Sequence, residues 1–495
     1  MTVKAPMKDM VVILPGLLGS VLQKDGKDLW AVSGRSFWDV VTRSERAIQS
    51  LALDAEDDGT LDDLGDGIRA TALMKDVHLI PGVVKLNGYT ELTRMLTDCF
   101  QMTVGDIHHD PDDKAANLYH FPYDWRRDNR VHARQLKMLI DRRLTCWREH
   151  SGAPDAKVIL LGHSMGGLVA RYYLEVLGGW QDARALFSFG TPYRGSMNAV
   201  NFLANGYKQL FLDLTGVVRS LTSIYQLLPV YPVIKTGSDY VRITETDQIP
   251  HVNLARALNA RAFHDEIYDA VQANQNNEAY RRQFTTVPIV GIRQPTLQSA
   301  ELRDGKLTPS EVLPAVLQGQ GDFLDGDGTV PKISAIPYEL STSFNNRFIA
   351  ETHCALQNQV QVLQGLRAAI GMPQFAGAAN VRTIPNTIGL AVDDLYLPNE
   401  PLTLEARVIA YPNISGLKAV VTPAFGEGAT LMAAFEETRF SSAEASASQH
   451  WSLMIDSLPA GLYRVTVSAE GLPPQLLPPP VHSLFEVVSA QDLNA

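Results

Sequence analysis

The chain has 495 residues, more than one ordinary domain needs, so its length predicts two or three domains. Hydrophobic residues make up 45% and charged residues 20%, a composition typical of a globular protein with a large core. The net charge of −11 argues against nucleic-acid binding and against electrostatic attraction to anionic membranes, while peripheral membrane contact through apolar residues stays an alternative.

The cysteine content and the N-terminus bear on location. The three cysteines are too few for a disulfide framework, which favours a reducing, cytoplasmic compartment: Cys99, Cys146 and Cys354. The apolar stretch 10–22 imitates a signal peptide, but Asp9 precedes it and Pro15-Gly16 interrupts it, so secretion is the alternative. No apolar run approaches the roughly 18 residues of a membrane span. The sequence contains no CxxC or HExxH motif, and we expect neither a metal nor a cofactor.

Residues 1–375 alternate short apolar runs with helical patterns, which is typical of a mostly parallel sheet with helices on both faces. The predicted strands are Met10–Leu14, Leu118–Phe121, Val158–Leu161, Leu186–Phe189 and Val287–Val290. The predicted helices are Leu168–Leu177 and Leu356–Ile370. Residues 1–375 are therefore predicted to form one α/β domain.

The tail, residues 381–495, has a different periodicity. Leu402, Leu404, Ala406 and Val408 alternate with polar residues, and similar short strands are predicted at Trp451–Ile455, Tyr463–Val467 and Leu484–Val488. Strands at this spacing predict an immunoglobulin-like β-sandwich joined by a linker at 371–380. Because the tail holds no candidate catalytic residue, we expect it to fold alone and to serve positioning or partner binding.

The strongest local motif is Gly162-His163-Ser164-Met165-Gly166, between an apolar strand and a helix. In such a G-x-S-x-G turn the serine occupies a strained conformation that exposes its oxygen at the helix N-terminus. We therefore predict an α/β-hydrolase fold with a helical cap at roughly 200–280. In it, Ser164 is the predicted nucleophile and His163 only fills space beside it.

A nucleophilic serine needs a base and an acid, which follow it in the chain in this fold. His353 precedes the last helix and is the predicted base, with His251 and His264 as weaker alternatives. Asp327 is the predicted acid, because it opens a stretch that returns to extended structure. The acidic segment also offers two rivals, Asp322 and Asp325, and a calcium loop as an alternative interpretation.

Four further segments have predicted roles. The loop Pro15–Ser20 follows the first strand, so the Leu17 and Met165 amides are the predicted oxyanion hole. The apolar segment 210–232 is predicted to line an acyl site, with Leu210 and Leu228 as substrate-binding candidates. Tyr123–Arg126 is expected to be structural, and the acidic stretch 54–59 to be a solvated loop.

Several of these motifs, in the same order, resemble the lecithin:cholesterol acyltransferase and lysosomal phospholipase A2 family. They are Pro15–Ser20, Pro122–Arg126, Gly162–Gly166, Phe189–Ser196, Ser220–Pro229 and Gly326–Pro331, with His353 following. The resemblance covers roughly residues 10–370. It implies a triad of Ser164, Asp327 and His353, an oxyanion hole at Leu17 and Met165, and glycerolipid or similar esters as substrates. Secreted members carry a disulfide-closed lid, whereas residues 30–87 here contain no cysteine, a departure that argues against sterol or lipoprotein activity.

The sequence therefore predicts a serine esterase, lipase or acyltransferase that acts on lipid-like carboxylic esters through an acyl-serine intermediate. The alternative is a catalytically inactive hydrolase-fold protein whose β-sandwich binds a partner.

Overall fold

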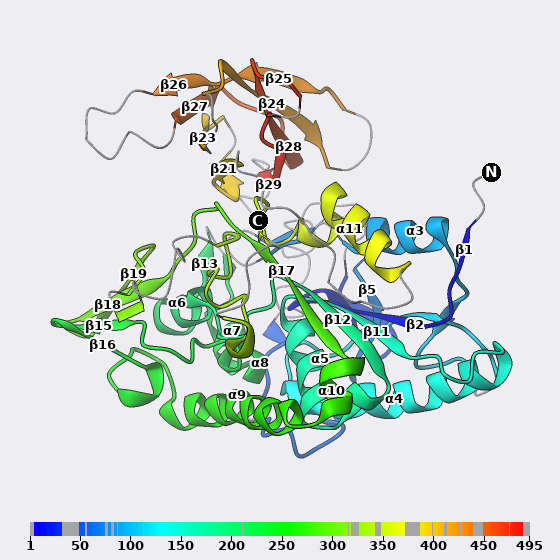
Figure 1. Cartoon of the computed structure of the whole chain (residues 1–495). Coiled ribbons are helices and arrows are strands. Elements are labelled where there is room, and N and C mark those ends of the chain that lie inside the picture. Colours follow the sequence, from blue (N-terminus) through cyan, green and yellow to red (C-terminus); the bar gives the residue numbers. More distant parts are fainter. Residues whose placement is uncertain are drawn as a thin grey trace.

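The computed structural model describes most of the chain. The described residues are 4–31, 49–54, 57–74, 78–80, 84–86, 88–111, 113–209, 212–314, 316–317, 326–341, 348–371, 387–397, 399–409, 413–424, 428–438, 449–474 and 476–488. A layered α/β part and a smaller all-β part make up the molecule, and the all-β part lies above the α/β part in Figure 1.

A seven-stranded sheet organises the α/β part, in the order β20-β17-β12-β11-β2-β10-β9. All of its neighbouring strands are parallel. The strands are β2 (Met10–Leu14), β9 (Val104–Asp106), β10 (Leu118–His120), β11 (Val158–His163), β12 (Ala183–Phe189), β17 (Thr285–Gly291) and β20 (Phe348–Ile349). The five strands predicted from apolar runs all belong to this sheet, so that prediction is confirmed.

Helices cover both faces of the sheet because alternate strand residues point to opposite sides. Val11 and Ile13 of β2 belong to the core under α3 (Thr90–Cys99) and α11 (Val360–Ile370). Met10, Val12 and Leu14 belong to the core over α4 (Asn129–His150) and α5 (Met165–Glu175). Figure 1 shows α3 and α11 above the sheet and α4 and α5 below it.

The segment between β12 and β17 adds five helices: α6 (Met197–Asn205), α7 (Thr215–Ser220), α8 (Thr222–Tyr225), α9 (Leu254–Gln275) and α10 (Glu278–Gln283). A four-stranded sheet flanks them, in the order β16 (Asp239–Val241), β15 (Ile234–Thr236), β18 (Ser299–Arg303) and β19 (Lys306–Ser310). The apolar segment 210–232 contains α7 and α8. Leu210 lies outside the described residues.

Smaller pairings complete this part. A three-stranded sheet combines β4 (Lys27–Trp30), β3 (Ser20–Lys24) and β5 (Ile68–Leu73). The two-stranded sheets pair β1 (Ala5–Pro6) with β8 (Phe100–Gln101), β6 (His78–Ile80) with β7 (Val84–Leu86), and β13 (Lys208–Gln209) with β14 (Leu212–Asp213).

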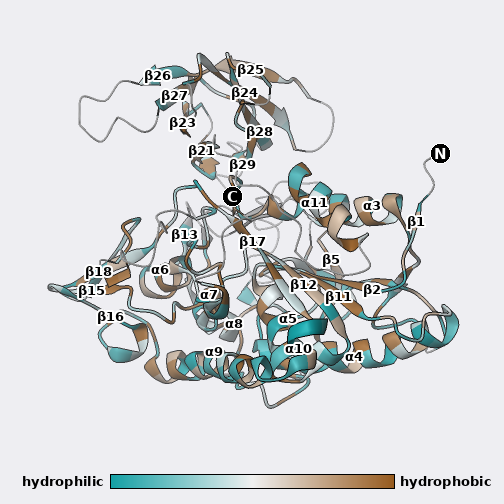
Figure 2. Cartoon of the chain, in the orientation of Figure 1, coloured by the Kyte–Doolittle hydropathy of each residue, from teal (hydrophilic) through white to brown (hydrophobic). Residues whose placement is uncertain are grey.

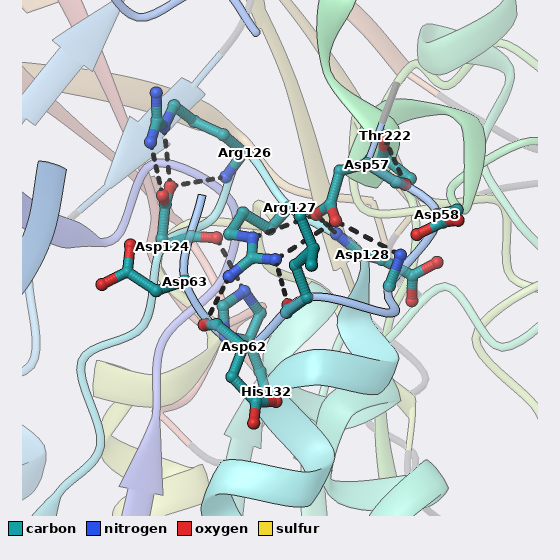
Figure 3. Close-up of polar contacts among 12 residues, drawn as sticks. Asp57, Asp58, Asp62, Asp63, Asp124, Arg126, Arg127, Asp128, His132 and Thr222 are labelled. Atoms are coloured by element: carbon teal, nitrogen blue, oxygen red, sulfur yellow. Dashed lines mark hydrogen bonds and ion pairs between the residues drawn. The ribbon is translucent and has the colours of Figure 1, made fainter. Parts of the chain in front are cut away.

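Buried ion pairs fix the start of α4 (Figure 3). Arg126 donates to both carboxylate oxygens of Asp124 at 2.8 and 2.6 Å, and to Asp66 at 2.7 Å. Arg127 donates to Asp57, which is only 3% exposed. Burial alone would raise the pKa of Asp57, but its hydrogen bonds and the Arg127 charge outweigh burial and hold that pKa below its usual value. The prediction that 54–59 is a solvated loop is therefore wrong for Asp57, whose carboxylate is buried and paired with Arg127.

The tail forms two antiparallel sheets that pack as a β-sandwich. One orders β21 (Thr387–Val392), β23 (Leu402–Ile409), β27 (Gln449–Ile455) and β26 (Glu436–Thr438). The other orders β22 (Leu395–Tyr396), β29 (Val481–Val487), β28 (Gly461–Glu470), β24 (Gly416–Pro423) and β25 (Leu431–Ala434), with β22 parallel to β29 and the other pairs antiparallel. The apolar residues of β23 are buried as the period of two predicts. Of the predicted linker, only Gly371 is a described residue.

Hydropathy follows this architecture. The parallel strands are mostly brown in Figure 2, whereas α4, α9 and α10 carry hydrophilic residues in teal. Among the described helices, none combines the length and apolar character that a membrane span requires.

Candidate active site

Ser164 lies in the turn between β11 and α5, with φ 50° and ψ −124°. Two glycines make the turn sterically feasible. A Cβ on Gly162 would lie 2.8 Å from the Gly167 Cα, and a Cβ on Gly166 would lie 2.3 Å from the Pro15 carbonyl oxygen. Positive φ at a non-glycine residue costs on the order of 1–3 kcal/mol, so the surrounding packing must hold the serine in place. The Ser164 N–H donates to the Phe189 carbonyl at 2.9 Å, which ties the turn to β12.

The structure brings Ser164, His353 and Asp327 into one hydrogen-bonded line. His353 Nε2 lies 2.9 Å from Ser164 Oγ, and His353 Nδ1 lies 2.7 Å from Asp327 Oδ2. Ser164 is 8% exposed and Asp327 is 1% exposed. A nucleophile next to a base, with the base oriented by a buried carboxylate, is the arrangement that activates a serine hydroxyl.

Backbone groups orient the Asp327 carboxylate. Its Oδ1 accepts hydrogen bonds from the N–H groups of Thr329 and Val330, at 3.0 and 2.7 Å. The His353 N–H donates to the Asp327 carbonyl at 2.8 Å, so the segment that carries Asp327, after β19, and the loop after β20 hold each other. With Oδ1 occupied in this way, Oδ2 is directed at the imidazole. The rivals Asp322 and Asp325 lie outside the described residues.

His163 and Tyr89 connect the oxyanion loop to the histidine loop. Burial, with a smaller contribution from nearby His353, lowers the pKa of His163 to about 3, so its ring is neutral. The neutral ring donates from Nε2 to the His353 carbonyl, 3.1 Å away. Its Nδ1 then accepts from the Tyr89 hydroxyl, 3.0 Å away. The Tyr89 oxygen in turn accepts the Gly16 N–H at 2.9 Å. No motif singled out Tyr89, because it lies 74 positions from His163 in the sequence.

The predicted oxyanion loop packs directly on the nucleophile. A Cβ on Gly16 would lie 2.8 Å from the Ser164 Cβ, and Leu17 lines the same cavity as Ser164. Met165 is the first residue of α5, and N–H groups in a first helical turn have no carbonyl partner within the helix. Both predicted amides therefore belong to residues beside Ser164.

The segment Tyr123–Arg126 anchors that loop. The Tyr123 hydroxyl donates to the Pro15 carbonyl at 2.8 Å, and the Trp125 indole donates to the Ser20 carbonyl at 3.1 Å. These contacts agree with the structural role expected for the segment.

The other candidate histidines do not reach Ser164. His264 Nε2 lies 2.8 Å from the Gln226 carbonyl, and burial lowers the pKa of His264 to about 4. Neither His251 nor His264 lines the cavity that contains Ser164. Among the described residues, no group of three His, Cys, Asp or Glu side chains could hold a metal ion.

A cavity of about 540 Å³ opens over the three residues, a size usual for small-molecule sites. One side is apolar, formed by Leu17, Ala199, Phe202, Ile224 and Leu227. Leu228, predicted to bind substrate, is buried but does not line this cavity; its neighbour Leu227 does. The difference arises because adjacent residues after α8 point in different directions, which apolar composition alone does not reveal.

Comparison with known proteins agrees with the motifs. The lecithin:cholesterol acyltransferase family model matches residues 86–291, which include Ser164 and end before Asp327. No curated protein matches the chain. Among solved structures, the lipase BlEst2 of Bacillus licheniformis in propeptide form is 13% identical, with 98% of this chain and 94% of that chain covered and a TM-score of 0.31. The crystal structure of a CARDB domain from Pyrococcus furiosus is 12% identical, with 21% of this chain and 87% of that chain covered and a TM-score of 0.14.

Proposed function

We propose that this chain acts on lipid-like esters through an acyl-serine intermediate, as its match to the lecithin:cholesterol acyltransferase family model over residues 86–291 supports. The activity class, hydrolysis or transfer of acyl groups in lipid esters, follows from the family. The proposal adds the mechanism and the residues that carry it. Cytoplasmic location, peripheral membrane contact and a protein partner of the β-sandwich stay predictions from the sequence.

In the first half-reaction Ser164 Oγ attacks the ester carbonyl while His353 Nε2 takes the hydroxyl proton. The Leu17 and Met165 N–H groups donate to the oxyanion that forms on the carbonyl oxygen. Asp327 stabilises the imidazolium. The C–O bond to the alcohol then breaks, His353 protonates the leaving oxygen, and an acyl-serine ester remains. Water or a second alcohol attacks that ester with the proton transfers reversed.

The observation that carries the proposal is the unbroken line from Ser164 Oγ through the His353 ring to Asp327, with both contacts below 3 Å. A scaffold that only binds a partner needs no strained serine at such a line. The alternative of an inactive interaction protein is therefore not favoured. The apolar wall beside Ser164 supports an acyl chain as the part of the ester that enters the cavity.

Fluorophosphonate labelling of the full chain tests the proposal. Wild type should be labelled, and Ser164→Ala should lose labelling and about 10⁴-fold or more of its ester turnover. Ser188→Ala is the matched control, because Ser188 is a buried serine on the adjacent strand β12 whose oxygen accepts from Tyr193. Full labelling of Ser164→Ala would mean that another nucleophile exists and would refute the mechanism.

A further inference from the structure

The cavity over Ser164 is built from two parts of the chain. The α/β part supplies the catalytic residues and the apolar wall of α6 and the α8 region. The β-sandwich supplies residues from β21, the turn after it, β23 and β29: Leu390, Ala391, Val392, Asp393, Asp394, Thr403, Glu405 and Ser483. A molecule that fills this cavity would contact both parts, which makes the sandwich a wall of the substrate site.

Specific contacts fix β21 to the loop that carries Asp327. The Gln294 amide oxygen accepts from the Leu390 N–H at 3.1 Å, and its amide nitrogen donates to the Ile388 carbonyl at 3.4 Å. The Gln294 backbone N–H donates to the Gly326 carbonyl at 3.0 Å. Gly389 leaves no room for a side chain, because a Cβ there would lie 2.3 Å from the Arg293 carbonyl oxygen.

A second set of contacts joins β29 to the loop that carries His353. Thr352 Oγ1 donates to the His482 carbonyl at 3.1 Å. The His482 N–H donates to Glu351 Oε1 at 3.4 Å. Thr352 directly precedes His353, and His482 directly precedes Ser483, which lines the cavity. The sandwich is therefore held in register with both loops, and its wall keeps a fixed position relative to Ser164.

The two walls differ in chemistry. The wall of α6 and the α8 region is mostly apolar, with Ser196 and Asn198 as its polar residues. The sandwich wall adds the carboxylates of Asp393, Asp394 and Glu405 to the apolar residues of β21. Among the described residues that line the cavity, none is Lys or Arg. An acyl chain suits the first wall, which leaves the alcohol portion of the ester to face the second.

We propose that the β-sandwich binds the alcohol portion of the ester and that it selects alcohols carrying a positive charge over neutral and anionic ones. This inference rests on the proposed function of Ser164. Carboxylates at the edge of a partly enclosed cavity attract a cation more strongly than in open water, because part of the screening solvent is displaced. Asp393 and Glu405 are exposed, which limits the expected preference to about three- to tenfold at low salt.

The test compares two esters of the same acid, butyrylcholine and 3,3-dimethylbutyl butyrate, whose alcohols have nearly the same shape and differ by one positive charge. Wild type should show a kcat/KM about three- to tenfold higher for the choline ester. The variant Asp393→Asn/Glu405→Gln should bring that ratio close to one, and Glu405→Lys should lower it further. Melting temperature checks that each variant is folded.

A matched control separates the cavity from the charge of the whole molecule. Asp98→Asn/Glu149→Gln removes the same two charges from exposed positions on α3 and α4, outside the cavity, and should keep the wild-type ratio. An equal fall in this control would overturn the inference, as would a wild-type ratio near one. Hydrolysis of neither ester by a chain that a fluorophosphonate labels at Ser164 would also overturn it, while leaving the proposed function intact. Loss of Ser164 labelling itself would refute the proposed function instead.

Discussion

Replacing Asp327 with Asn isolates the role of one carboxylate oxygen, since the side chain keeps its size. In the native protein Oδ1 accepts two backbone N–H groups while Oδ2 faces His353 Nδ1. An asparagine has only one acceptor oxygen for these two sites. It must therefore present its NH₂ group either to the two backbone donors or to the imidazole.

The structure decides between these orientations. If the NH₂ group faced the Thr329 and Val330 amides, both N–H donors would lose their acceptor, at a cost of about 1–3 kcal/mol for the buried Val330 N–H and less for the partly exposed Thr329 N–H. If it faces His353, the two backbone donors keep their acceptor, and the imidazole must carry its proton on Nε2 so that Nδ1 can accept from the NH₂ group. A ring protonated at Nε2 cannot take the Ser164 proton. Variants of this kind in a known serine protease lose about 10⁴-fold in kcat, and we expect a loss of several orders of magnitude here.

Turnover of a soluble p-nitrophenyl ester measures the effect, with melting temperature as the check on folding. Asp325→Asn is the comparison, and we expect it to cost about tenfold or less through loop distortion. A fall of less than tenfold in Asp327→Asn, or a larger fall in Asp325→Asn, would refute the assignment of Asp327 and move it two residues upstream.

Two further predictions concern the cavity wall and a buried acid. Leu227→Ala should lower kcat/KM for a decanoate ester about three- to tenfold more than for an acetate ester, because Leu227 lines the cavity. Leu228→Ala is the control, since it removes the same atoms outside the cavity. An equal change in the chain-length preference of Leu228→Ala would contradict the reasoning. Burial raises the pKa of Glu351 to about 8. Between pH 4.5 and 8 the folded protein therefore keeps a proton on Glu351 that the unfolded chain releases. Through this residue the wild type loses stability as the pH rises, by up to about 1.4 kcal/mol per pH unit. A glutamine cannot titrate, so the melting temperature of Glu351→Gln relative to that of wild type should rise from pH 5 to pH 8. Parallel pH profiles of the two melting temperatures would show that Glu351 is already ionised in the native state.

Local sequence was sufficient where one short segment determines its own geometry. The turn at Ser164 needs an apolar strand, a helix and glycines at fixed offsets, all within about fifteen residues, so the motif predicted the strained conformation that the structure has. The strands of the parallel sheet were equally visible, because burial on both faces requires continuous apolar runs such as Met10–Leu14.

Long-range polar contacts were not visible in the same way. Asp57 reads as one of several acidic residues in a loop, and only the fold brings Arg127 to it across 70 positions. Tyr89 likewise has no local signature, although its hydroxyl contacts both Gly16 and His163. Such pairings depend on which elements pack together, and propensity and periodicity do not carry that information.

The β-sandwich shows the same limit at the level of a whole module. A period of two reports which residues are buried, but not what the exposed residues face. Thr403 and Glu405 alternate with the buried Leu402 and Leu404, as solvent-facing residues would, yet they line the cavity over Ser164. The sequence therefore suggested a tail separable from the chemistry. A chain ending near residue 376 would lack both β21 and β29, and with them the partners of Gln294 and Thr352. Because those two residues lie beside the loops of Asp327 and His353, we expect removal of the tail to loosen both loops, although the contacts of Thr329 and Val330 with Asp327 stay within the α/β part.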